Sequence, residues 1–225
     1  MTPIKRLIAT PLACLLTTAA SEAAFTYLDA VDGAGGNTTL ANGDTLDAND
    51  GTGATTWRQR DNAAFGSGPA GSVFEGVDPS PEIKTTISGL TPGATYTIHV
   101  HFWDPQSTTE DWNVSAGLTT GSLTTFTREA GAVSGSVASV LASTLSYDVA
   151  PTQFGPNSGR EMLAGLVGNA VADGGGNIEV FIDDFGSTDV NQRTWYDGVS
   201  HELVPEPSVA LLGAFGLLGL LRRRR

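Results

Sequence analysis

The sequence predicts an all-β chain: one jelly-roll-like β-sandwich between an N-terminal signal peptide and a short C-terminal transmembrane helix. Short apolar runs alternate with polar residues at a period of two, which is typical of strands with one buried face. The chain contains 28 glycines, and Thr, Ser, Asn and Asp cluster between the runs, as in proteins with many tight turns. No stretch shows an amphipathic helix of three turns. With 225 residues, 40% of them hydrophobic, one domain with a real core is expected.

The N-terminal segment 1–23 has the three parts of a secretory signal peptide. A charged start (MTPIKR) precedes an apolar stretch and small residues, and cleavage is expected after Ala23, with Ala20 as the alternative. The only cysteine, Cys14, lies in this segment, and Pro11 disfavours lipidation there because a lipoprotein signal has an aliphatic residue at that place. The exported domain therefore contains no cysteine, so that its core, or bound ions, must stabilise it.

The clearest predicted strand is TYTIHVHFWD, residues 95–104, in which apolar and polar positions alternate. The motif L-x-P-G-x-x-Y, from Leu90 to Tyr96, resembles the tyrosine corner of fibronectin-like sandwiches. That resemblance implies a hydrogen bond from the Tyr96 hydroxyl to the backbone upstream of its strand. Gly174-Gly175-Gly176-Asn177 is predicted to be a hairpin loop. Further strands are expected over residues 83–87, 72–77, 112–118, 122–129, 161–173, 177–185 and 193–204, and residues 130–160 are expected to combine strands with long loops.

The expected sandwich, residues 24–203, is strongly acidic. It contains six basic and 22 acidic side chains, a net charge of −16. Such a body repels phosphate backbones, which excludes nucleic acid as a partner. The order of its W-R, VFE, HFWD, IDD and RTWYDGV segments resembles exported bacterial proteins of unknown function, and its layout is similar to that of carbohydrate-binding jelly rolls.

His99, His101 and Trp103 share one face of the strand at 95–104. We expect this face to be the outer, half-solvated one. A His-x-His pair can also bind zinc, but a zinc site needs further ligands. The candidates for these ligands are His201, Asp104 and Glu110.

The loop Asn42–Gly53 is rich in oxygen ligands and is a candidate calcium site, with calcium as a possible cofactor. Its spacing is not that of an EF-hand, and a solvated turn-rich loop is the favoured interpretation. The four side chains that would bind the ion are Asp44, Asp47, Asn49 and Asp50.

The sequence predicts a protein that is not an enzyme. It lacks G-x-S-x-G, H-E-x-x-H and P-loop motifs, and the exported part has no cysteine nucleophile. Asp183 and Asp184 are adjacent on a strand and therefore point to opposite faces, which makes them a poor acid–base pair. One of them could join a calcium site at the strand end, but the capping of a turn is the favoured interpretation. The alternative is a secreted carbohydrate-active enzyme, because such an enzyme needs only two suitably separated carboxylates.

The four tryptophans suggest a glycan-binding surface, because flat indole rings suit sugar rings. Trp195 is expected in the core, while Trp103 and Trp112 are expected to be exposed and to bind a neutral or weakly acidic extracellular polysaccharide. Ice binding is a third possibility, which needs a flat array of threonines. The sequence offers only fragments of such an array, at Thr119, Thr120, Thr124, Thr125 and Thr127.

The C-terminal segment 204–225 combines a proline bracket, an apolar stretch and a basic end. The 14 residues Ser208–Leu221 would span ~21 Å as a helix, and snorkelling arginines bring this closer to the ~30 Å of a membrane core. Under the positive-inside rule the arginines stay cytoplasmic and the body lies outside. The bracket consists of Val204, Pro205, Glu206 and Pro207, and the basic end consists of Arg222, Arg223, Arg224 and Arg225.

Together these three parts resemble the PEP-CTERM sorting signal of Gram-negative bacteria, a tail that is also labelled as the C-terminal domain of ice-binding proteins. The resemblance implies processing by an exosortase-like transpeptidase after export across the inner membrane. Before processing, the tail would hold the protein in the membrane. The implied location is the cell envelope, the outer surface or the extracellular space, and the implied role is structural or glycan-binding in an exopolysaccharide or biofilm matrix.

Overall fold

The computed structural model describes residues 24–46, 57–60, 73–76, 80–105, 112–128, 137–150, 160–184 and 193–205. The expected signal peptide and most of the expected sorting segment lie outside these residues. Within the described ranges, no helix has both the length and the apolar character needed to cross a membrane.

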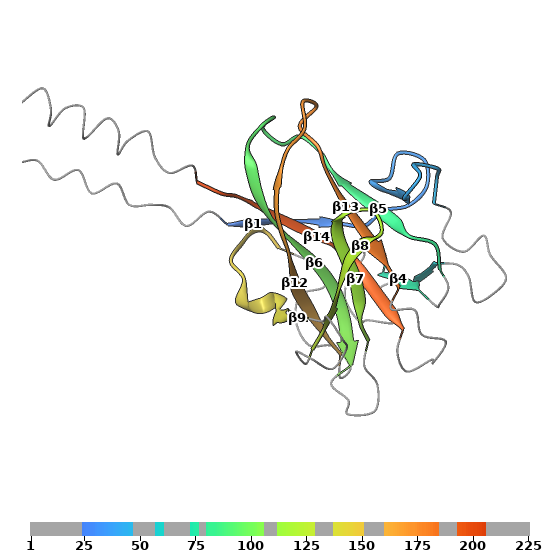
Figure 1. Ribbon diagram of the computed structural model, residues 1–225. Helices are drawn as coiled ribbons and strands as arrows, with labels where there is room; N and C mark the ends of the chain where they lie inside the picture. Colours follow the sequence, from blue (N-terminus) through green and yellow to red (C-terminus); the bar gives the residue numbers. More distant parts are fainter. Residues whose placement is uncertain are drawn as a thin grey trace, which may run out of the picture.

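The described chain is all-β and forms two sheets, as predicted (Figure 1). The first sheet has the strand order β10-β12-β6-β14-β1-β11, with β4 paired to β14 and β3 paired to β4. The second sheet has the order β2-β5-β13-β7-β8-β9. The strands are β1 (Phe25–Asp29), β2 (Thr38–Leu40), β3 (Arg58–Arg60), β4 (Val73–Gly76), β5 (Ile83–Ile87), β6 (Thr95–Pro105), β7 (Val114–Thr119), β8 (Ser122–Thr127), β9 (Val137–Ala138), β10 (Val140–Leu141), β11 (Tyr147–Val149), β12 (Arg160–Val171), β13 (Ile178–Asp183) and β14 (Thr194–Leu203).

The eight strands that the sequence predicts by their residues are confirmed as β4 to β8 and β12 to β14. The prediction missed β1, β2 and β3, which are short. It also left residues 130–160 without defined elements, where the structure has β9, β10, a 3-10 turn (Ala142–Thr144) and β11. Strand β3 has no apolar residue, and β2, β9, β10 and β11 are only two or three residues long, so that these strands carry too little period-two signal to be predicted.

The main core lies between the two sheets. Ile98, Val100 and Phe102 of β6 are fully buried and pack in one cluster with Val180 and Ile182 of β13. These are the apolar positions of the predicted alternation, so that the period-two pattern identified the inward face of β6 correctly.

The tyrosine corner is confirmed. The backbone N–H of Thr91 donates a hydrogen bond to the Tyr96 hydroxyl at 3.0 Å. Gly93 in the same turn has φ 78°, a left-handed conformation in which glycine avoids the strain of a side chain.

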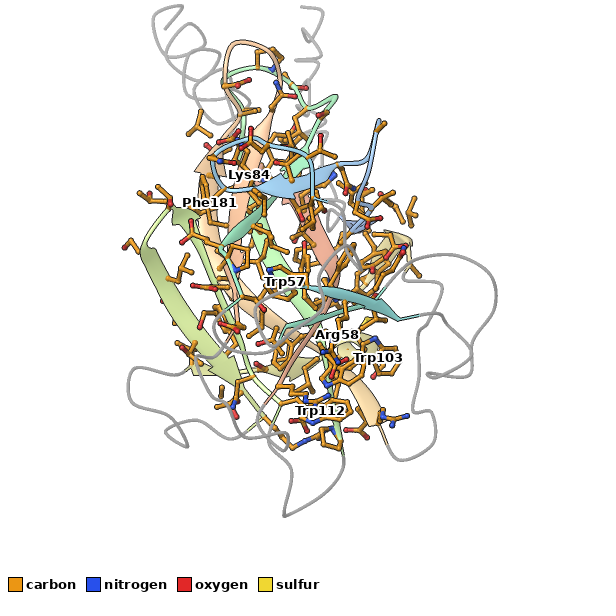
Figure 2. The ribbon with its side chains drawn as sticks, turned by 90° about the vertical axis from the view of Figure 1, so that its right-hand side faces the viewer. Trp57, Arg58, Lys84, Trp103, Trp112 and Phe181 are labelled. Carbon is orange, nitrogen blue, oxygen red and sulfur yellow. The ribbon has the colours of Figure 1, made fainter. Side chains whose placement is uncertain are left out.

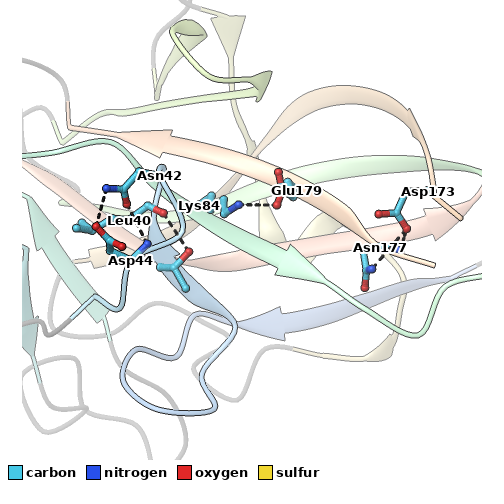
Figure 3. A network of polar contacts seen from close by, with 8 residues as sticks. Leu40, Asn42, Asp44, Lys84, Asp173, Asn177 and Glu179 are labelled. Carbon is cyan, nitrogen blue, oxygen red and sulfur yellow. Dashed lines mark hydrogen bonds and ion pairs between the residues drawn. The ribbon is translucent and has the colours of Figure 1, made fainter. Parts of the chain in front are cut away.

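The loop after β12 is a tight turn, but the predicted hairpin is wrong. The Asp173 carboxylate accepts the backbone N–H groups of Gly175 and Asn177, each at 2.8 Å. Figure 3 shows the Asn177 side chain beside this carboxylate. However, β12 pairs with β6 in the first sheet, whereas β13 pairs with β5 and β7 in the second. The turn therefore connects the two sheets, because turn chemistry specifies a reversal of the chain and not the pairing of the strands beside it.

Residues 137–149 cover the outer face of the first sheet, and we call them the covering segment. Its strands β10 and β11 pair with opposite edges of that sheet, while β9 pairs with β8 of the second sheet. Between these strands, Ala142 and Leu145 pack in a second apolar cluster with Trp103 and Met162. The first sheet is therefore buried on both faces over much of its area.

The two chain ends leave the sandwich at the same end. Strand β1 pairs antiparallel with β14, with Thr26 opposite His201, so that β1 starts where β14 finishes (Figure 1). At the opposite end, which we call the far end, β6 finishes at Pro105 beside the start of β12 at Arg160. The start of β14 at Thr194 lies at the far end as well, opposite Gly76.

Candidate functional site

His99, His101 and Trp103 share one face of β6 as predicted, but the expected half-solvated position is wrong. Their exposed fractions are 7%, 0% and 0%. Aromatic rings enclose the imidazoles: Phe25 meets His99 edge-on at 4.7 Å between centroids, and Tyr27 meets His101 at 5.2 Å. Burial lowers the pKa of His99 to about 4 and that of His101 to about 3, so that both rings are neutral at pH 7.

The described residues do not assemble the zinc site considered from the sequence. The His201 ring packs against Tyr96, and Asp104 is bound to Arg128. Glu110 lies outside the described residues. In the described part of the chain no group of three or more His, Cys, Asp and Glu side chains could hold a metal ion.

A buried polar network connects β1, β6 and β14 beneath the covering segment. The Tyr27 hydroxyl donates a short hydrogen bond to the Asp197 carboxylate, and Trp103 Nε1 donates to the other carboxylate oxygen at 3.0 Å. Burial raises the pKa of Asp197 to about 6, although these two hydrogen bonds favour the ionised form. Sequence reasoning missed this network because Tyr27 lies on a strand that was not predicted.

His101 Nε2 lies 2.8 Å from Ser200 Oγ, a contact that resembles the nucleophile and base of a hydrolase. Both side chains have no exposed area, and His101 Nδ1 finds no hydrogen-bond partner in the described part of the chain. A catalytic pair needs access for the substrate and a group that orients the base. The contact joins β6 to its neighbour β14, and the described residues provide neither of these two features.

The expected exposed tryptophan pair is wrong, because Trp103 is fully buried and Trp112 is only 6% exposed. Figure 2 shows both rings toward the far end of the sandwich, away from Lys84. Trp112 instead stacks on Trp195, with ring centroids 4.8 Å apart and an interplanar angle of 26°. Trp195, which was expected in the core, is partly exposed and packs against the second apolar cluster.

Arginines surround the stacked tryptophans at the far end. The guanidinium carbon of Arg160 lies 5.5 Å from the centroid of the Trp112 ring, within the range of a cation–π contact. Arg193 forms an ion pair with Glu75, whose side chain is fully buried. Glu75 lies opposite Trp195 in the pairing of β4 with β14. We call Trp112, Trp195, Arg160 and Arg193 the far-end cluster.

A second ion-pair network lies next to this cluster. Arg128 Nε donates to Asp104 Oδ1 at 2.5 Å, and its Nη1 donates to Glu161 Oε2 at 2.8 Å. The other oxygen of Asp104 accepts the backbone N–H of Trp112 at 3.3 Å. Sequence reasoning missed both networks. The sequence contains one indication of such ion pairs: the sandwich has six basic and 22 acidic side chains. Each arginine is therefore expected to pair with a carboxylate, but the sequence does not show which one.

Asp183 and Asp184 lie at the end of β13, and the residues that follow them lie outside the described ones, so that the capping of a turn stays a prediction. Asp184 is buried and accepts the backbone N–H of Ser80 at 3.1 Å, and its own N–H donates to Asp183 Oδ1 at 2.9 Å. Burial and the neighbouring Asp184 charge raise the pKa of Asp183 to about 6. The Ser80 contact ties the end of β13 to the segment that precedes β5.

The calcium candidate is described only at Asp44. Its carboxylate accepts a hydrogen bond from Asn42 Nδ2 at 2.8 Å (Figure 3). Its backbone carbonyl accepts the N–H of Leu40 at 2.9 Å, which closes a tight turn. Asp47, Asn49 and Asp50 lie outside the described residues. The calcium site therefore stays a prediction.

The sorting segment is described only at its start. Val204 N–H donates to the carbonyl of Thr95 at 2.9 Å, and Pro205 is exposed. The remaining sorting residues, Glu206, Pro207 and Arg222 to Arg225, lie outside the described residues.

No protein-family model matches the chain, and no curated protein matches it.

Proposed function

We propose that the chain is an exported cell-surface or extracellular-matrix protein with a non-catalytic sandwich. Its C-terminal segment is the sorting signal, processed by an exosortase-like transpeptidase after export across the inner membrane of a Gram-negative bacterium. The observation that carries this proposal is the position of that segment: β14 ends at Leu203, and the exposed Pro205 follows two residues later. Prolines hold a chain extended, which suits a site that a transpeptidase must reach.

The pairing of β1 with β14 indicates how the sandwich would be oriented relative to the membrane. Because β1 starts beside the end of β14, the signal peptide and the sorting segment are attached at the same end of the sandwich. A protein held through that segment presents its far end away from the membrane. The far-end cluster is then the part of the described sandwich that faces the surroundings of the cell.

The proposed fold is a jelly-roll-like sandwich. Along the chain, β4, β6, β12 and β14 lie in the first sheet, while β5, β7 and β13 lie in the second, so that successive strands repeatedly change sheet. This alternation is the feature of a jelly roll, and sandwiches of this kind host many binding and structural roles.

Burial of the reactive groups supports a non-catalytic role over the alternative of a secreted carbohydrate-active enzyme. Ser200, His101 and Asp197 have at most 1% of their surface exposed. Ice binding has less support than either, because Thr127 is fully buried and Thr125 lies 3.0 Å from the Ser115 hydroxyl. The threonines of this hairpin do not share one open face.

The proposal is tested by following the protein in its native host. The wild type should reach the envelope or the medium with its C-terminal segment removed. A variant with Pro205→Ala, Glu206→Ala and Pro207→Ala should keep the segment and accumulate in the inner membrane. Wild-type protein found at full length in the cytosol would contradict the proposal.

A further inference from the structure

Hydrogen-bond donors without partners gather at the far end. Trp112 Nε1, Arg193 Nε and Arg128 Nη2 are buried atoms with no hydrogen-bond partner among the described residues. All three are donors that cannot accept a hydrogen bond. Such groups are normally paired when buried, so that a cluster of them calls for a molecule rich in acceptors.

Contacts join these donors into one region. The Trp112 ring stacks on Trp195 of β14, and Arg193 precedes the first residue of that strand. The Trp112 backbone N–H binds the same Asp104 carboxylate that Arg128 binds. The region reaches the surface, because the Arg193 and Arg128 side chains are 23% and 30% exposed and Trp195 is half-buried.

We propose that the far-end cluster binds a neutral saccharide, with one pyranose ring packed on the indole of Trp195 and its oxygens accepting from Trp112 Nε1 and the arginines. Indole faces suit the apolar faces of sugar rings, and hydroxyl oxygens supply the acceptors that the cluster needs. Trp112 supports Trp195 from behind and contributes its N–H, while Arg160 fixes the Trp112 ring by a cation–π contact.

The charges at the far end favour a neutral ligand over an acidic one. Arg128 already faces Asp104 and Glu161, and Arg193 faces Glu75, so that the guanidinium charges are balanced by carboxylates. The sandwich as a whole carries a net charge of −16, which disfavours polyanions further. This inference deepens the proposed function by naming a ligand class, and it rests on that function for its extracellular setting.

The test is a fluorescence titration of the purified full chain in mild detergent with cello-, xylo- and galacto-oligosaccharides, and with an oligogalacturonide as the acidic arm. We expect saturable binding of at least one neutral sugar and weaker binding of the oligogalacturonide. Trp195→Ala should weaken the affinity about tenfold, through loss of the stacking surface. Trp112→Phe should weaken it roughly fivefold, the effect of one lost hydrogen bond.

Trp103→Phe is the matched control, because the N–H of Trp103 is already bonded to Asp197 within the protein. It should lower the melting temperature and leave the affinity unchanged. Trp112→Phe should also lower the melting temperature, because it shortens a buried and stacked ring, but unlike Trp103→Phe it should weaken the affinity as well. No binding of any neutral sugar, unchanged affinity in Trp112→Phe, or tighter binding of the oligogalacturonide would each overturn the inference. None of these results bears on where the protein is located in its host. The proposed function is tested separately by the localisation experiment.

Discussion

Replacing His101 should remove part of the acid sensitivity of the fold. His101 is fully buried, and burial lowers its pKa from the ordinary 6.5 to about 3. As the pH falls below 6.5, the unfolded chain therefore binds a proton that the folded chain does not bind, and the free energy of unfolding decreases. The loss approaches ~1.4 kcal/mol for each pH unit and continues until the folded pKa is reached.

Between pH 7 and pH 5 this single histidine should contribute a loss of about 2 kcal/mol, since most of that interval lies below the unfolded pKa. Asp183 and Asp197 act in the opposite direction below pH 6, because a raised folded pKa lets the folded chain bind a proton first. The wild-type pH dependence is therefore a sum, and a comparison with a variant isolates His101.

The assay is urea unfolding of the wild type and of His101→Gln at pH 7 and pH 5. Glutamine cannot titrate, and its amide can still reach the Ser200 hydroxyl that His101 contacts. The wild type should lose about 2 kcal/mol more than the variant between the two pH values. Equal losses in the two proteins would show that His101 is not held neutral by burial.

Three further predictions concern stability. Tyr96→Phe should lower the free energy of unfolding by about 1–3 kcal/mol in urea, because Thr91 N–H loses its acceptor; an unchanged midpoint would contradict the tyrosine corner. Gly165→Ala should cost about 1–3 kcal/mol, because the new Cβ would lie 2.4 Å from the Phe126 ring, whereas Gly174→Ala, with nothing within 4 Å, should change little. Millimolar calcium should raise the melting temperature relative to EDTA, because the acidic body repels itself; identical melting curves would remove the calcium prediction.

The sequence predicted the parts of the fold that depend on local patterns. The alternation in β6 identified Ile98, Val100 and Phe102 as core residues, and the turn before Tyr96 had the composition of a tyrosine corner. Pairing could not be predicted in this way, because the turn after β12 has the same composition whether or not the flanking strands pair.

The candidate site was predicted less well than the fold, and the reason is the covering segment. A strand pattern shows that His99, His101 and Trp103 share a face, but not that another part of the chain covers this face. The covering segment is rich in Ser, Ala and Val and has no strong period, so that its packing onto the sheet had no local signal. For this reason Trp103, which was expected to be exposed, is buried under the covering segment, whereas Trp195, which was expected in the core, is partly exposed.

The most direct test of the proposed function is to label a single cysteine on intact cells. Cys14 is the only cysteine and lies within the expected signal peptide. Ser122→Cys, at the exposed first residue of β8, should therefore create the only thiol of the exported chain. A PEG-maleimide that does not cross the outer membrane should label this thiol on intact cells of the native host. The labelled protein should have lost both its first 23 residues and its sorting segment. Labelling that appears only after the cells are lysed, on a chain of full length, would contradict the proposal.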